Sequence, residues 1–132
     1  RIFLDVDDLE VIGSLSQYIR ASNSVLVFLS KGYFFSSNCR KELDAALAHR
    51  SPLILLHETD LKRGGASLEQ LRDDCPAESR SKVFAYGRPV IPWLRIKDFQ
   101  LVSLKMIISL MLRHANRKAP LVAPTQYKLA LP

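Results

Sequence analysis

Short apolar runs separated by segments of helical periodicity recur along the chain. Runs that favour buried strands occupy residues 2–6, 24–29, 52–56 and 90–94. The run at 24–29 (SVLVFL) is continuously apolar, which is typical of a parallel strand covered on both faces. Pro92 removes a backbone donor from the last run, so we expect that strand to lie at a sheet edge or to end there.

Helices are expected between these strands. Apolar residues at helical spacing after Ser14, an acceptable N-cap, predict a helix near residues 15–21. Ser36 offers a cap for a second helix over residues 38–49. The apolar positions of that second helix share one face: Cys39, Leu43, Ala46 and Leu47.

The second half of the chain is less regular. Residues 57–88 are predicted to be mostly connection, with one short helix indicated by the capping-box pair Ser67 and Gln70. Residues 99–113 are strongly apolar and predict a long, well-packed final helix.

This alternation predicts one α/β domain, with a parallel sheet and helices on both of its faces. We expect the domain to span residues 1–114, and residues 115–132, which contain proline and lack periodicity, to form a flexible tail. In open sheets of this kind, sites form where strands end at their carboxyl termini. That rule indicates three candidate regions: residues 5–10, 30–33 and 57–60.

Charge and composition argue against several classes of function. The formal net charge is +6, but the basic residues of the second half are spread singly, without the aromatic clusters expected of a nucleic-acid surface. No apolar run is long enough to span a membrane, and we expect a soluble cytoplasmic protein. Cys39 and Cys75 are then reduced thiols. Neither they nor the three histidines show metal-ligand spacing, so we expect no metal and no cofactor.

A more specific pattern covers the first third of the chain. It comprises Phe3 and Asp5, an acidic loop (Asp7, Asp8, Leu9, Glu10 and Gly13), the strand VLVFLS at 25–30, and YxxSxNCxxEL at 33–43. These residues resemble a Toll/interleukin-1 receptor (TIR) domain of plant or microbial type. The corresponding family motif carries Trp where this chain has Asn38. The resemblance continues more weakly to about residue 112, through PLILLHE and IPWLRIKDFQ.

The resemblance implies a three-layer flavodoxin-like fold with five parallel strands, and signalling by assembly with other TIR domains or with itself. Residues 7–13 would form the family's BB loop, a contact surface for assembly. The family's first strand and first helix would precede Arg1, so we expect an N-terminally truncated domain. Strands 2–6 and 24–29 would then lack their common neighbour or pair directly.

The alternative function implied by the resemblance is NAD+ cleavage. NAD+-cleaving TIR domains use a glutamate in the helix after the third strand, and Glu42 matches that position. A carboxylate beside the ribose stabilises the oxocarbenium-like transition state of this reaction. NAD+ would be a substrate, in a candidate pocket formed by Asp5, Ser30, Tyr33 and Cys39. Such members also use a loop after the first strand, which this chain lacks, and Glu42 beside Arg40 and Lys41 also fits a solvated helix acid.

A remoter alternative is a phosphatase of the haloacid-dehalogenase type. Asp5 and Asp7 resemble that family's first motif, hhhDxDx, in which the first Asp attacks phosphorus and the second acts as acid and base. Ser30, after the next strand, resembles the second motif. The acid pair expected to bind magnesium would be Asp73 and Asp74, but no apolar strand precedes them, and we therefore favour the TIR-like interpretation.

Overall fold

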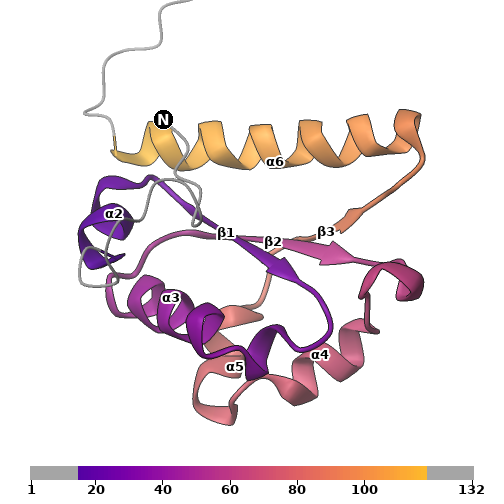
Figure 1. Cartoon of the computed structure of the whole chain (residues 1–132). Helices are drawn as coiled ribbons and strands as arrows, with labels where there is room; N and C mark the ends of the chain where they lie inside the picture. The colour runs from indigo at the N-terminus through magenta and orange to yellow at the C-terminus, as the bar shows by residue number, and fades with distance from the viewer. Residues whose placement is uncertain (1–14, 119–132) are drawn as a thin grey trace, which may run out of the picture.

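A parallel sheet of three strands forms the centre of the computed structural model, which describes residues 15–118. The strands follow one another in the sheet in the order of the chain (Figure 1). They are β1 (Val25–Leu29), β2 (Leu53–Glu58) and β3 (Val90–Trp93). The predicted parallel α/β arrangement is therefore confirmed for the part of the chain that the structure describes.

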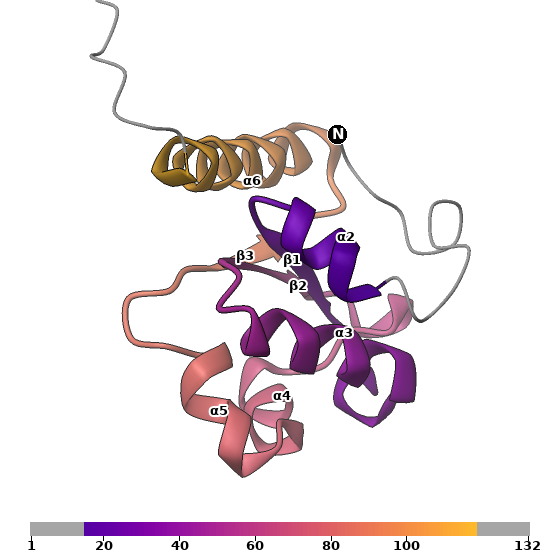
Figure 2. The same ribbon diagram turned by 90° about the vertical axis from the view of Figure 1, so that its left-hand side faces the viewer.

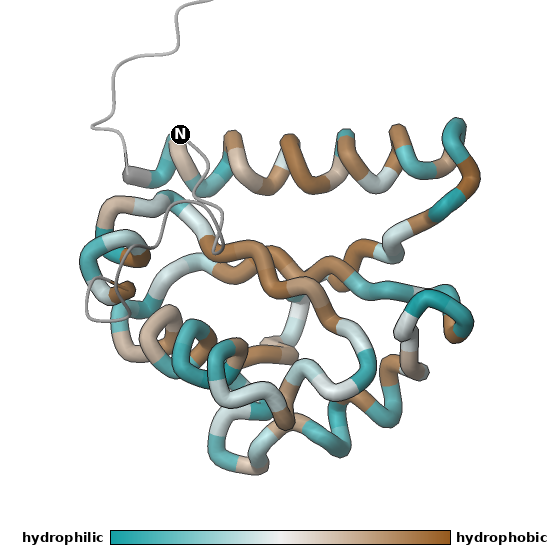
Figure 3. Tube along the Cα trace, viewed as in Figure 1, coloured by the Kyte–Doolittle hydropathy of each residue, from teal (hydrophilic) through white to brown (hydrophobic). Residues whose placement is uncertain are grey.

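Helices lie on both faces of the sheet and give three layers, as in a flavodoxin-like fold (Figures 1 and 2). One face is covered by α3 (Ser37–Ala48), α4 (Leu68–Asp74) and α5 (Ala77–Val83), and α6 (Lys97–Lys118) runs across the other. The remaining helix, α2 (Leu15–Ala21), packs against α3. Figure 3 shows the apolar strands lying between these two helical layers.

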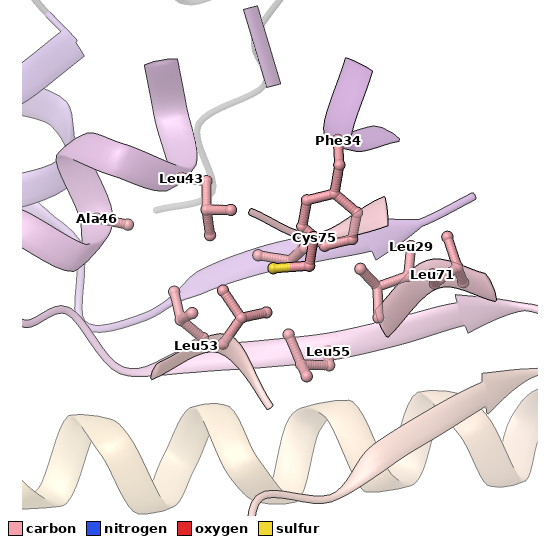
Figure 4. Packing of buried hydrophobic residues seen from close by; sticks show 10 residues of the cluster. Leu29, Phe34, Leu43, Ala46, Leu53, Leu55, Leu71 and Cys75 are labelled. Carbon is pink, nitrogen blue, oxygen red and sulfur yellow. The ribbon is translucent and has the colours of Figure 1, made fainter. Parts of the chain in front are cut away.

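The buried residues form one cluster on each face of the sheet, because the side chains of β2 alternate between the faces. Leu53 and Leu55 point into the cluster beneath α3, α4 and α5, where they meet Phe34 and Leu71 (Figure 4). The opposite cluster, beneath α6, consists of Ile54, Leu56, Ile91 and Ile107. The continuous apolar run of β2 is thus explained by its central place in the sheet.

The expectation that both faces of β1 are covered is wrong. Val27 and Leu29 are buried, whereas Leu26 and Phe28 on the other face are 50% and 38% exposed. The reason is the position of α6, which packs on β2 and β3 (Figure 2). Within residues 15–118, one face of β1 is therefore apolar and open.

Local signals placed most helix boundaries correctly. The Ser36 side chain accepts a hydrogen bond from the Cys39 backbone N–H at 3.3 Å and starts α3. Ser67 caps α4 in the same way, through the predicted Gln70 N–H at 3.1 Å. Helix α5 was missed, because its N-cap residue is Pro76, which provides no side-chain cap, and the helix has little apolar periodicity.

Pro92 lies in β3 at the edge of the described sheet, as predicted. Its carbonyl accepts a hydrogen bond from the buried Ser103 hydroxyl of α6 at 2.6 Å. The same hydroxyl accepts a hydrogen bond from the Leu94 backbone N–H at 3.4 Å. Ser103 therefore fastens α6 to the end of β3.

The final helix is longer and far less buried than predicted. It begins two residues before Phe99 and continues to Lys118, beyond the expected domain boundary at residue 114. Between Lys97 and Arg117, the buried residues of this helix are Ser103 and Ile107 alone. Its exposed large apolar side chains are Phe99, Leu101, Val102, Leu104, Met106, Ile108 and Leu112. Close packing of the whole apolar segment was thus the wrong expectation.

Several predictions lie outside the described residues. These are the strand at 2–6, the loop residues Asp7, Asp8, Leu9, Glu10 and Gly13, the candidate pocket residue Asp5, and most of the expected tail.

Candidate functional site

The motif at 33–43 folds as a tight turn followed by a helix. Gly32 has a left-handed backbone conformation, with φ of 83°, and precedes the short 3-10 helix η2 (Tyr33–Phe35). The Ser30 carbonyl accepts a hydrogen bond from the Tyr33 backbone N–H at 3.1 Å. The carboxyl end of β1 therefore leads directly to Tyr33. This is where a site is expected, because sites in open parallel sheets form at the carboxyl ends of the strands.

Three of the candidate site residues lie close together at this turn. Tyr33 is partly buried, and its burial and the nearby Cys39 and Glu42 side chains raise its pKa above the usual value. Glu42 and Cys39 lie on α3 and are both half-buried. The sequence motif therefore corresponds to one cluster in space, in which Cys39 and Glu42 lie near enough to act on the Tyr33 phenol.

A second polar cluster lies where β2 and β3 end. Glu58, the last residue of β2, is fully buried and accepts a hydrogen bond and ion pair from Arg95. The same carboxylate accepts a hydrogen bond from the Asp60 backbone N–H at 3.0 Å. Burial alone would raise the pKa of Glu58, but the hydrogen bonds and the charges of Arg95 and Arg63 outweigh it, so the pKa is lowered. Glu58 is thus a buried carboxylate that stays ionised.

An open depression of about 600 Å³ lies beside this ion pair, lined by Asp60, Lys62, Arg63 and Arg95. Asp60 caps the 3-10 helix η3 (Leu61–Arg63) by accepting a hydrogen bond from the Lys62 backbone N–H at 2.9 Å. The region 57–60 was a predicted site region, but its three basic partners were missed. A pointer was available, since Arg95 follows the end of a strand and Lys62 and Arg63 follow another.

Glu42 does not line this depression, so the two polar clusters are distinct. The acid pair named for the phosphatase alternative lies on a helix. Asp73 and Asp74 lie in the last turn of α4, and the Asp74 carboxylate accepts a hydrogen bond from the Gln70 side chain at 2.7 Å. Within residues 15–118, no three His, Cys, Asp or Glu side chains are grouped so that they could hold a metal ion.

Comparison of the chain with protein-family models, with curated proteins and with solved structures found no match. Over residues 15–118, no helix combines the length and apolar character that crossing a membrane requires.

Proposed function

We propose that this chain is a TIR-like signalling module that assembles with a second copy of itself through α6 and the open face of β1. The observation that carries the proposal is the exposure of α6. A helix that is apolar on every side is normally buried, yet α6 contacts the sheet along one side only. An apolar surface of this extent on a folded domain marks an interaction site.

Both α6 and the open face of β1 expose apolar residues. Leu104 and Ile108 each follow a buried residue, Ser103 and Ile107, and so point about 100° further around the helix. Leu26 and Phe28 are exposed on the open face of β1, and Leu104 and Ile108 are exposed on α6.

Charge complementarity favours a second copy in antiparallel orientation. Asp98, in the first turn, is the only acid of α6, and the last turns carry Arg113 and Arg117. Antiparallel packing of two α6 helices brings the Asp98 end of one against the arginine end of the other. Parallel packing would place basic side chains against their own copies.

The resemblance supports assembly as the mode of action. The TIR family signals through domain association, and the motif at 33–43 is the most specific part of the likeness. The loop at 7–13 is the second expected contact surface. We place the module in the cytoplasm, where free thiols such as Cys39 and Cys75 are typical.

Sedimentation equilibrium over a range of protein concentrations tests the proposal. We expect reversible self-association of the wild type, and Ile108→Glu should weaken it strongly because it places a charge in the apolar contact. Leu61→Glu is the matched control, since Leu61 is an exposed apolar residue that belongs to η3 and not to α6. A wild type that stays monomeric, or equal effects of both variants, would refute assembly through α6.

A second candidate function is NAD+ cleavage by Glu42. What favours it is the grouping of Glu42 with Tyr33 and Cys39 at the end of β1. Nicotinamide release, followed by chromatography, should be lost in Glu42→Gln and retained in Asp44→Asn, an exposed acid of the same helix. Release that is absent from the folded wild type, or unchanged in Glu42→Gln, would exclude a catalytic Glu42.

A further inference from the structure

We propose that the depression at the carboxyl ends of β2 and β3 binds a phosphate group of a small-molecule ligand through Arg95, Arg63 and Lys62. This site does not depend on assembly through α6. It lies where open α/β sheets bind their ligands, at the carboxyl ends of adjacent strands.

The first argument is the ion pair that holds Arg95. A carboxylate that is fully buried loses its hydration, and a buried pair of this kind is weak as a source of stability compared with apolar packing. The ion pair instead orients the Arg95 side chain, because the Glu58 carboxylate accepts a hydrogen bond from one N–H group of the planar guanidinium. The Arg95 side chain is still 40% exposed, which leaves donors available to a ligand in the depression.

The second argument is the rigid backing of Lys62 and Arg63. The Asp60 carbonyl accepts hydrogen bonds from the Arg63 and Gly65 backbone N–H groups, both at 2.9 Å. Gly65 packs so closely that a Cβ atom there would lie 2.7 Å from the Glu58 carbonyl oxygen. The Lys31 backbone N–H also donates to the Gly64 carbonyl at 2.8 Å. The loop that presents the two basic side chains is thus held in place before any ligand arrives.

The third argument is the balance of charge. The depression is lined by three cations and one acid, Asp60, which accepts a hydrogen bond from the Lys62 backbone and lies 4.0 Å from the Arg63 guanidinium. Glu58 offsets one further positive charge, and a positive excess remains. Guanidinium groups donate two parallel hydrogen bonds to a phosphate, and the lysine adds a point charge. An open, polar depression of about 600 Å³ accepts the phosphate end of a small molecule.

The test is a titration of the whole chain with inorganic pyrophosphate at low ionic strength, followed by amide NMR. We expect saturable shifts in the amides of residues 58–65 and of Arg95. The double variant Lys62→Gln/Arg63→Gln should bind about tenfold more weakly or worse. The matched control is Arg40→Gln/Lys41→Gln, an adjacent and equally charged pair exposed on α3.

Arg95→Lys adds a test of geometry. It keeps the positive charge beside Glu58 but removes the planar fork, so binding should weaken while thermal unfolding confirms a folded chain. Shifts that never saturate, or equal losses in the α3 control, would overturn the proposal because they would report bulk charge. An acidic peptide that bound here while pyrophosphate did not would overturn it as well, in favour of a protein partner.

Discussion

The Arg95 guanidinium donates a hydrogen bond to the buried Glu58 carboxylate and so joins the ends of two neighbouring strands. Glu58 pairs with Trp93 in the sheet register, and Arg95 follows two residues later. The contact therefore closes the carboxyl edge of the sheet just where β3 leaves it for α6. The same carboxylate also accepts a hydrogen bond from the Asp60 backbone N–H. Asp60 begins the loop 60–65, which carries Lys62 and Arg63 and is called the basic loop below.

Glu58 makes stability depend on acid pH. Because its folded pKa is lowered, its contribution is fully present above pH 4.5, the ordinary pKa of the carboxyl, and is lost as the pH falls through the lower folded value. We expect urea midpoints of the wild type and of Glu58→Gln to converge as the pH falls below 4.5. A difference between them that is independent of pH would show that the Glu58 charge is not what stabilises the fold.

The two faces of β1 should respond differently to truncation. Leu29→Ala removes a fully buried side chain and should lower the free energy of unfolding by about 2–5 kcal/mol. Leu26→Ala, at a half-exposed position of the same strand, should cost less than about 1 kcal/mol. Urea denaturation at low protein concentration measures both. Equal losses would mean that the open face of β1 is covered in the monomer.

Gly65→Ala tests the packing of the basic loop. The added Cβ atom meets backbone atoms of Glu58 and Asp60, which cannot move aside as a flexible side chain can, so we expect a loss of about 1–3 kcal/mol and shifted loop amides. Gly87→Ala is the control, because its φ of 75° imposes backbone strain but nothing lies near the new atom. The loop spectrum of the control should match that of the wild type. Unshifted loop amides in Gly65→Ala would contradict a close-packed loop.

The antiparallel arrangement of α6 predicts a charge exchange between copies. Asp98→Arg and Arg113→Asp should each weaken self-association, by about threefold to tenfold at low salt, because each places like charges at both ends of the helix pair. An equimolar mixture of the two variant chains should associate again, since opposite charges then face each other. Sedimentation equilibrium distinguishes these cases. If the mixture associates no more strongly than either variant alone, the antiparallel orientation is excluded.

Much of the fold could be predicted because helix and strand signals are local. The capping serines Ser36 and Ser67 act on N–H groups three residues away, so their effect can be recognised from sequence spacing alone. Helix α5 escaped notice for the same reason, since it lacks both a cap and an apolar stripe. Residue pattern alone could not show which strands have a covering helix.

The two polar clusters also differ in how far the sequence could predict them. Tyr33, Cys39 and Glu42 are close in the chain, and one turn and one helix are enough to bring them together. Glu58 and Arg95 are 37 positions apart, and only the parallel pairing of β2 with β3 makes them neighbours. No spacing rule links two residues of that separation, and the sequence indicates only that the basic residues each follow the end of a predicted strand.

The sequence by itself determined the alternation of strands and helices, the parallel sheet, and the edge position of Pro92, because these follow from periodicity, caps and missing backbone donors. The tertiary structure alone decided what covers each apolar side chain. Helix α6 and β1 have apolar residues on sides that nothing in residues 15–118 buries. An apolar residue gives the same sequence pattern whether it packs inside its own domain or against a partner. Only the positions of the neighbouring helices and strands distinguish these two cases.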